Sequence, residues 1–319
     1  MREYTSTLAP HIREFITFQQ ASKRWNESSY AVNLNLFDKY CKSNFPNTGH
    51  LTQEMVNSWC AKRDSENNNS CRSRIYVVVS FIKYLQRRGI TDVQIPVIPS
   101  KEPRTYIPHA FTSEELTNFF NACDSIPASP RTEEQLSRKM TVPVFFRLLY
   151  SSGIRINEAR LLRKDNVDLE QNVLNIEYSK GHPQHFIVMH DSMLHLMRKY
   201  DNAISKLYPD RTFFFPARGG ECHTANWVRS NFNKMWKHSN DSYATAYTLR
   251  HNYAIENING WTDDGFAFND KLLYLSKSMG HSVIESTKYY YSLVPRLADV
   301  LASHTNEDET IPEVCHESL

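Results

Sequence analysis

Apolar residues recur every three or four positions through the first ninety residues of the chain, which is the spacing of one helix face. Leu8, Ile12 and Phe15 are the first example. A plausible N-cap, Thr52, precedes one of the later apolar runs. We therefore expect a four-helix domain over residues 1–92, which is about the size of a small domain. Its expected helices span 8–22, 28–43, 51–60 and 71–88, with a loop at 65–70.

A proline-rich segment follows this domain. Proline has a fixed φ and no backbone N–H, so closely spaced prolines exclude a helix and favour an extended chain. We expect a linker over residues 93–110, which also carries the basic residues Lys101 and Arg104. Its prolines are Pro96, Pro99, Pro103 and Pro108.

Helical spacing resumes at residue 111. Thr112 or Ser113 can cap the next helix, and Glu114 and Glu115 lie in its first turn, where the helix dipole favours acids. Gly280 is expected to end a later helix in a left-handed conformation. The expected helices of this second unit span 113–122, 140–151, 157–163, 191–206, 224–238, 247–258, 268–279 and 293–302, with a polar loop at 127–139. Residues 284–291 continue from the later Gly-His pair to the tyrosine cluster.

Strand-like runs interrupt these helices at 166–169, 172–179 and 184–190. Short turns separate them, which predicts a three-stranded antiparallel sheet. The expected fold is therefore mainly α, with an α-helical second domain over 111–302 that contains one small sheet. Residues 303–319 form an acidic tail.

Charge is unevenly distributed. The whole chain carries 37 Lys and Arg against 35 Asp and Glu, a net charge of +2. Residues 303–319 hold five of the acids and no Lys or Arg, so residues 1–302 carry a net charge of +7. A moderately basic body is compatible with phosphate contacts, although an ordinary solvated surface explains the charge equally well.

The cysteines give no sign of a metal site. None of the six forms a C-x-x-C pair, and none lies with His at zinc-ligand spacing. Cys222 and His223 are adjacent, but no second pair accompanies them. We expect reduced thiols and no bound metal.

Membrane and export signals are also lacking. The sequence has no run of about 18 apolar residues. Its N-terminus has no apolar signal core. We therefore expect a cytoplasmic protein without a membrane partner.

One stretch, from Tyr247 to Tyr291, carries most of the candidate chemistry. It contains the pair Arg250 and His251, a Gly-His pair at 280–281, and a tyrosine cluster at 289–291. Upstream, Arg155 precedes Glu158 by three residues. A guanidinium neutralises a phosphate through paired hydrogen bonds, and a tyrosine can hold phosphorus covalently. Each residue alone is more often a surface, capping or packing residue.

The order and spacing of these residues resemble the tyrosine recombinase, or phage integrase, family. That family carries an Arg followed three residues later by an acid, a lysine on a β-hairpin, an H-x-L-R-H box, a G-H box, and a tyrosine nine residues after the last His. The matching residues are Arg155, Lys180, Arg250, His251, Gly280, His281 and Tyr290. Tyr247 stands where the family has the first His of its box.

The resemblance implies a mechanism that needs no cofactor. Arg155 and Arg250 shield the phosphate, and Tyr290 attacks it to form a 3′-phosphotyrosyl bond. Lys180 protonates the 5′-oxygen that leaves. His281 hydrogen-bonds the phosphate or the nucleophile.

Three further roles are less sharply defined. Glu158 is expected to orient Arg155 or a helix end, and His251 has either a structural or a base-assisting role. Tyr247 either donates a hydrogen bond to a phosphate oxygen or packs beneath the site. Tyr289 and Tyr291 have packing roles if Tyr290 is the nucleophile.

The resemblance also implies where DNA binds. The first domain corresponds to the family's SAM-like core-binding domain, and its fourth helix is expected to direct basic residues outward. The linker is expected to run along DNA. The candidate DNA contacts are Arg72, Arg74, Lys83, Lys101, Arg104 and Arg229.

The leading interpretation is a site-specific recombinase that acts as a homotetramer on two double-stranded DNA sites with inverted repeats. The helix at 293–302 is expected to dock on a neighbouring protomer. The absence of a module before residue 8 is typical of compact resolvases and transposon or integron recombinases. The alternatives are a type IB-like topoisomerase, which works as a monomer, and a non-catalytic DNA-binding regulator, which would have lost the nucleophile or the arginines.

Overall fold

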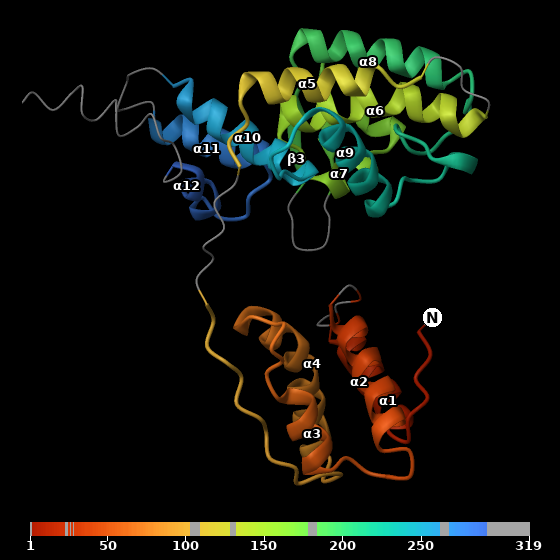
Figure 1. Cartoon of the computed structure of the whole chain (residues 1–319), viewed down its shortest axis with the longest axis vertical. Coiled ribbons are helices and arrows are strands. Elements are labelled where there is room, and N and C mark those ends of the chain that lie inside the picture. Colours follow the sequence, from red (N-terminus) through yellow and green to blue (C-terminus); the bar gives the residue numbers. More distant parts are fainter. Residues whose placement is uncertain are drawn as a thin grey trace, which may run out of the picture. The chain divides into compact units, whose positions relative to one another are not determined.

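The computed structural model describes residues 2–22, 25, 27, 29–102, 109–127, 132–177, 184–261 and 268–291. The chain divides into two compact units, Met1–Tyr106 and Ile107–Leu319 (Figure 1). The division lies inside the segment predicted to be the linker. Each unit is described by itself.

Four α-helices build the first unit in the part of it that is described. They are α1 (Ala9–Ala21), α2 (Tyr30–Asn44), α3 (Gln53–Cys60) and α4 (Asn68–Gln86). Their apolar faces form one core, to which Phe15, Phe37 and Phe81 each contribute a completely buried ring. The predicted cap of α3 is confirmed, because the Thr52 side chain accepts a hydrogen bond from the N–H of Met55.

The segment after α4 runs extended along this unit. Val93 is buried in the first core. The Gln86 side chain donates to the Val93 carbonyl at 2.9 Å, and the N–H of Gln94 donates to Gln53 Oε1 at 2.8 Å. Further along, Asn69 and Glu102 exchange two hydrogen bonds. The first part of the predicted linker is therefore anchored to the helices.

The second unit is larger and also mainly helical (Figure 1). Its described helices are α5 (Ser113–Asp124), α6 (Glu133–Ser152), α7 (Ile156–Arg160), α8 (Asp191–Ile204), α9 (Ala225–Ser239), α10 (Ala246–Asn259), α11 (Phe268–Ser278) and α12 (Glu285–Tyr291). Aromatic rings dominate its core, where Phe119, Phe146 and Trp236 all pack with Phe232 or with each other. Thr112, one of the two predicted caps, caps α5 and forms a capping box with Glu115.

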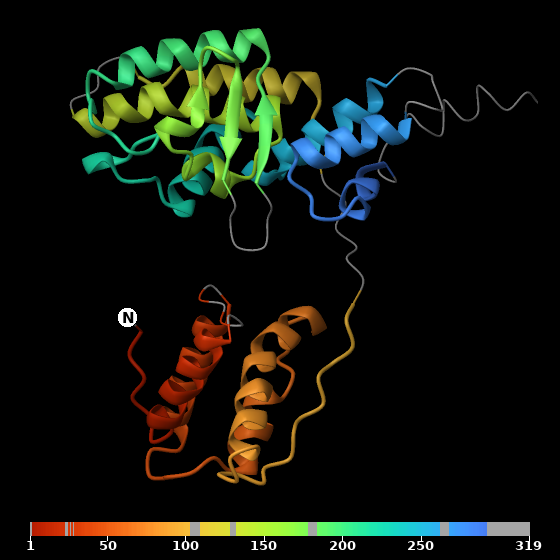
Figure 2. The same cartoon turned by 180° about the vertical axis from the view of Figure 1, so that it is seen from behind.

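The predicted sheet is confirmed. Strands β1 (Val167–Asp168), β2 (Val173–Ile176) and β3 (His185–Val188) pair antiparallel in the order β1-β2-β3. They lie side by side on the outside of the helical body (Figure 2). The fold class predicted from the sequence, a mainly α chain with one small antiparallel sheet, is therefore correct.

Two predicted loops are partly wrong. Helix α4 begins inside the polar run 65–70, because the Asn67 side chain caps it by accepting from the N–H of Ser70. Helix α6 begins at Glu133, within the predicted loop 127–139, and it continues through Pro143. Both errors have one cause, since the first turns of these helices are polar and show no apolar periodicity.

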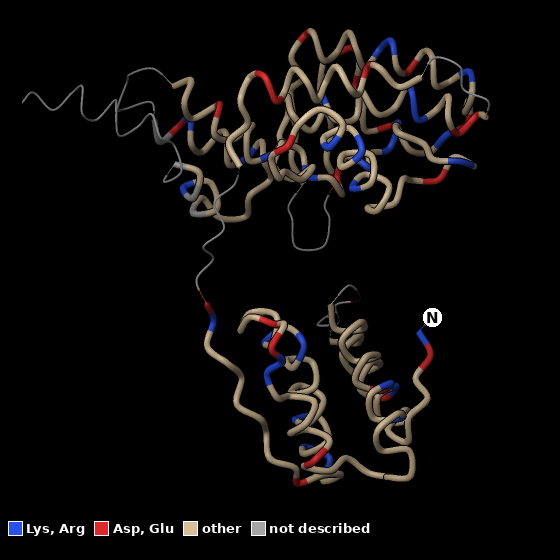
Figure 3. Tube along the Cα trace, in the orientation of Figure 1, with Lys and Arg blue, Asp and Glu red and all other residues tan. Residues whose placement is uncertain are grey.

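Lys and Arg positions are interspersed with Asp and Glu over both units (Figure 3). One of these basic residues, Arg74 on α4, was predicted to point outward, and this prediction is wrong. The Arg74 side chain is only 7% exposed, and it forms an ion pair with Glu66, which is 11% exposed. It also donates to the carbonyls of Trp59 and Ala61. A guanidinium with these partners joins α3 to α4.

Arg74→Ala should therefore destabilise the first unit. Removing one partner of a buried pair leaves the other charge uncompensated, which costs about 3–5 kcal/mol. Lys83→Ala, on the exposed face of the same helix, is the control and should change stability by less than about 0.5 kcal/mol. Calorimetric unfolding of the full chain measures both. Equal unfolding temperatures for the two variants would contradict the structural role.

Candidate active site

A left-handed glycine turns the chain into the site. Helix α6 ends at Ser152, and Gly153 follows with φ of 61°. A Cβ at residue 153 would lie 2.3 Å from the Tyr253 ring on α10. Only glycine accepts both the positive φ and this close approach. The turn therefore packs directly against α10, just before α7 begins.

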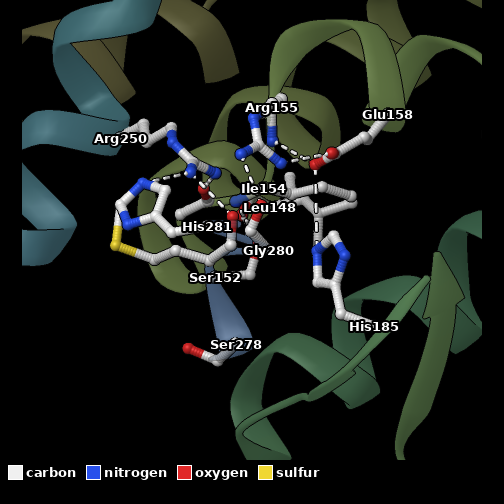
Figure 4. Close-up of polar contacts among 12 residues, drawn as sticks. Leu148, Ser152, Ile154, Arg155, Glu158, His185, Arg250, Ser278, Gly280 and His281 are labelled. Carbon is white, nitrogen blue, oxygen red and sulfur yellow. Dashed lines mark hydrogen bonds and ion pairs between the residues drawn. The ribbon is translucent and has the colours of Figure 1, made fainter. Parts of the chain in front are cut away.

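Arg155 lies immediately before α7, at the helix junction that the sequence predicted. Its Nη1 donates to Glu158 Oε1 at 2.7 Å, and its Nη2 donates to the Gly280 carbonyl at 2.6 Å (Figure 4). Glu158 also accepts the backbone N–H of Arg155 at 2.9 Å. The Glu158 side chain is only 4% exposed. Its carboxylate thus both orients the Arg155 guanidinium and caps the first turn of α7.

Arg250, on α10, is almost completely buried. It donates to the carbonyls of Gly153 at 2.5 Å and Met279 at 2.7 Å (Figure 4). These carbonyls lie at the C-terminal ends of α6 and α11, where the helix dipole favours a cation. Burial and the nearby charge of Arg155 lower the pKa of Arg250, but arginine remains protonated in proteins.

A second left-handed glycine, Gly280, follows α11. Its φ of 62° confirms the predicted conformation. His281 comes next, and its Nε2 accepts from Arg250 Nη2 at 3.0 Å. Since a guanidinium only donates, the ring proton is on Nδ1, which donates to Thr287 Oγ1 at 2.6 Å. His281 thereby connects the arginine to α12.

Tyr290 lies on α12 and is nearly buried. Its ring belongs to a small cluster that includes Ile255 and Met279. Its hydroxyl is 3.0 Å from Nδ1 of His251, the neighbour of Arg250 in the chain. Burial, followed by the charge of Arg250, lowers the pKa of His251 to about 4, so this imidazole is neutral near pH 7.

Tyr247, which replaces the family histidine, lies one turn before His251. It is 42% exposed and makes an edge contact with the His251 ring, 4.9 Å between centroids. It is therefore partly exposed at the edge of the site, and it lines the same cavity as Arg155.

Arg155 and Tyr247 open into a cavity of about 1030 Å³ within the second unit. Helix α9 forms its other wall through Arg229, Asn233 and Lys237. Arg229 is exposed and donates to Asn226 at 2.7 Å. The cavity thus joins Arg155 to the exposed basic side chains Arg229 and Lys237 of α9.

The remaining predicted site residues are distributed as follows. Lys180, Arg104 and the expected helix at 293–302 lie outside the described residues. Lys83 and Lys101 are exposed, and Arg72 donates to the Pro99 carbonyl. Their role in DNA binding stays a prediction.

One residue beside Glu158 was not predicted. His185, at the start of β3, lies with Nε2 3.9 Å from Glu158 Oε2 and is buried. Its signal in the sequence was the alternation of β3, in which positions 185, 187 and 189 face inward.

Within the described ranges, no group of three or more His, Cys, Asp or Glu side chains is arranged to hold a metal ion. None of the helices in that part of the chain is both long and apolar enough to span a membrane.

The family model described as the phage integrase family matches residues 110–295, more than half of the 319-residue chain. The chain therefore belongs to this family. The prediction that it is a tyrosine recombinase, and hence an enzyme, is confirmed. It is 24% identical to a tyrosine recombinase of Agathobacter rectalis over 319 residues, covering 95% of this chain and 99% of the relative.

Solved structures share the fold. A XerH site-specific recombinase bound to difH substrate, in a pre-cleavage complex, gives a TM-score of 0.66 at 14% identity, covering 95% of this chain and 98% of that chain. A lambda integrase dimer bound to a COC' core site gives 0.59 at 14% identity, covering 89% and 76%.

The Gly153 turn predicts a specific sensitivity. Gly153→Ala adds a clash with Tyr253 to the cost of a positive φ, whereas Gly219→Ala adds only the latter, about 1–2 kcal/mol, because its Cβ would meet open space. Gly153→Ala should therefore destabilise the protein more and also slow DNA cleavage. Denaturant unfolding and a cleavage assay test this. Equal losses for the two variants would show that the close approach to α10 is unimportant.

Proposed function

We propose that this tyrosine recombinase cleaves and rejoins DNA at specific sites through Tyr290. The hydroxyl attacks a phosphodiester, forms a 3′-phosphotyrosyl bond and releases a 5′-hydroxyl. The phosphotyrosyl bond retains the energy of the broken linkage, so a 5′-hydroxyl from another strand can reverse the attack. The observation that carries this proposal is the contact of Tyr290 with His251, directly beside the buried Arg250.

Arg155 and Arg250 would stabilise the charge that grows on the non-bridging oxygens. Both guanidiniums are fixed by acceptors before DNA arrives: Glu158 and the Gly280 carbonyl for Arg155, and two helix-end carbonyls for Arg250. A preorganised donor costs no rearrangement in the transition state, which supports this role.

His251 would receive the proton of Tyr290. Its neutral ring can accept at Nδ1, provided that Nε2 carries the ring hydrogen. A base with a pKa of about 4 is weak, but the charge of Arg250 is one cause of that low value. A bound phosphate offsets this charge and thereby raises the basicity of His251.

Two other roles complete the reaction. Lys180 would protonate the leaving 5′-oxygen, as the resemblance to the family implies. Tyr247, exposed at the edge of the cavity, would donate a hydrogen bond to a phosphate oxygen.

The active assembly would be a tetramer on two sites with inverted repeats, held by the segment at 293–302. The DNA-bound XerH and lambda integrase structures, to which this chain is similar in fold, support DNA as the substrate. A type IB-like topoisomerase would instead relax supercoiled DNA that lacks a specific site. A non-catalytic regulator is disfavoured because the nucleophile and both arginines are present.

Tyr290→Phe should bind DNA but form no covalent adduct on a nicked suicide substrate, because the phenyl ring keeps the packing and lacks the attacking oxygen. Tyr289→Phe and Tyr291→Phe are the matched controls and should still give adduct. Denaturing electrophoresis of labelled DNA measures the adduct. Adduct with Tyr290→Phe, and none with one of its neighbours, would place the nucleophile elsewhere.

Arg155→Ala and Arg250→Ala should each slow cleavage by about 10²–10³-fold, the usual cost of losing one such donor. Arg229→Ala, at an exposed position on α9, should affect cleavage much less. A neutral methylphosphonate at the scissile position should partly restore the two slow variants, since it needs less charge shielding. Failure to restore either one would count against the proposal that Arg155 and Arg250 stabilise the charge on the phosphate.

Tyr247→Phe should lower the single-turnover rate of cleavage without affecting folding, because it removes only the hydroxyl.

His251→Gln should slow cleavage by about 10²-fold or more, as expected for a lost general base. The pKa of His251 in the free protein is lowered to about 4, so DNA should meet a neutral imidazole at every pH between 8 and 6. Cleavage rates at subsaturating concentrations, which report the ionisation of the free protein, should therefore not fall across that range through protonation of His251. A loss centred near the ordinary histidine pKa of about 6.5 under these conditions, present in wild type and absent from His251→Gln, would contradict the lowered pKa.

A further inference from the structure

His185 belongs to the sheet but lies against the catalytic loops. It pairs with Ile176 in the β2–β3 ladder. Its side chain is 6% exposed and is directed away from solvent toward Glu158 (Figure 4). The next residue, Phe186, faces the other side of the strand and is 60% exposed. The strand thus places one imidazole at the edge of the active site.

The His185 ring touches both groups that hold Arg155. Its Nε2 lies 3.9 Å from Oε2 of Glu158, whose other oxygen accepts from Arg155. On the other side, a Cβ at Gly280 would lie 2.4 Å from Cε1 and 2.6 Å from Nδ1 of the ring. The imidazole therefore fills the space against the Gly280 backbone, whose carbonyl is the second acceptor of Arg155.

These contacts have a mechanical consequence. Arg155 can point into the cavity only while the Glu158 carboxylate and the Gly280 carbonyl keep their separation and direction. Glu158 belongs to α7, whereas Gly280 follows α11. Arg155 bonds to both, and Arg250 bonds to the neighbouring carbonyls of Gly153 and Met279. A rigid ring in contact with both Glu158 and Gly280 adds a direct constraint on their separation, because packed interiors resist small displacements.

We propose that His185 is a positioning residue for DNA cleavage, which holds Glu158 and Gly280 in the arrangement that directs Arg155 at the scissile phosphate. It does not touch the DNA. The role rests on the proposed function, in which Arg155 shields the phosphate. It requires that loss of His185 reproduce, in weaker form, the loss of Arg155.

The test compares four variants by single-turnover cleavage of a nicked substrate and by DNA affinity. His185→Ala removes the ring, His185→Gln keeps a donor and much of the volume, Phe186→Ala is the control on the opposite face, and Arg155→Ala is the reference. His185→Ala should slow cleavage by at least about tenfold, less than the ~10²–10³-fold expected for Arg155→Ala. DNA affinity should stay unchanged, His185→Gln should be intermediate, and Phe186→Ala should match wild type.

A methylphosphonate at the scissile position separates this role from a general loss of structure. The rate gap between His185→Ala and wild type should narrow on that substrate, as it should for Arg155→Ala. If Arg155→Ala is restored but His185→Ala is not, or if His185→Ala cleaves at the wild-type rate, His185 does not act through Arg155. If Arg155→Ala itself is not restored, the proposed role of Arg155 in shielding the phosphate is wrong instead.

A substrate with sulfur in place of the 5′-bridging oxygen tests the alternative that His185 acts on the general acid, Lys180. Its leaving group needs no proton, so it should restore Lys180→Ala. Restoration of His185→Ala by this substrate alone would show that the strand positions the general acid rather than Arg155, which overturns the proposal. If His185→Ala does not fold, His185→Gln replaces it in the same comparisons. The proposal is again overturned if His185→Gln cleaves the ordinary substrate at the wild-type rate and its rate relative to wild type is the same on the methylphosphonate substrate.

Discussion

The burial of the Arg250 guanidinium is the constraint on which the rest of the site depends. A cation taken out of water is costly unless its N–H groups find acceptors. Here the acceptors are the ends of two helices, at Gly153 and Met279, and the imidazole of His281. Each needs its own local geometry, so the two left-handed glycines, the junction before α7 and the turn before α12 are all fixed by one side chain.

The candidate nucleophile shares this dependence. Tyr290 completes a small cluster formed by α10, α11 and α12, and its hydroxyl meets a residue adjacent to Arg250. A short helix such as α12, Glu285–Tyr291, is not stable alone. The packing of the Tyr290 ring and the bond between His281 and Thr287 hold it to the body. The candidate nucleophile therefore also secures the helix to which it belongs.

Local signals account for what could be predicted from the sequence. Helical spacing, the Thr52 and Thr112 caps and the left-handed Gly280 each depend on neighbours within one turn. The exposed first turn of α6 carried no such signal. The burial of Arg74 and the contacts of His185 arise between segments far apart in the chain, and a basic or imidazole side chain gives no sign of them. The motif spacing identified Arg155 and Tyr290 as candidates, whereas the contact between Tyr290 and His251 required coordinates.

The acceptors of both arginines have one further consequence, for how the sequence can diverge. Three of them are peptide carbonyls, at residues 153, 279 and 280. No change of side chain deletes a carbonyl, so mutation can alter the surrounding helices widely while the electrostatic frame persists. The side chains on which the frame directly depends are Glu158 and His281, together with the two glycines. A chain that retains 24% identity with a relative across nearly its full length can thus drift through most of its positions without losing the frame in which the phosphate would be held.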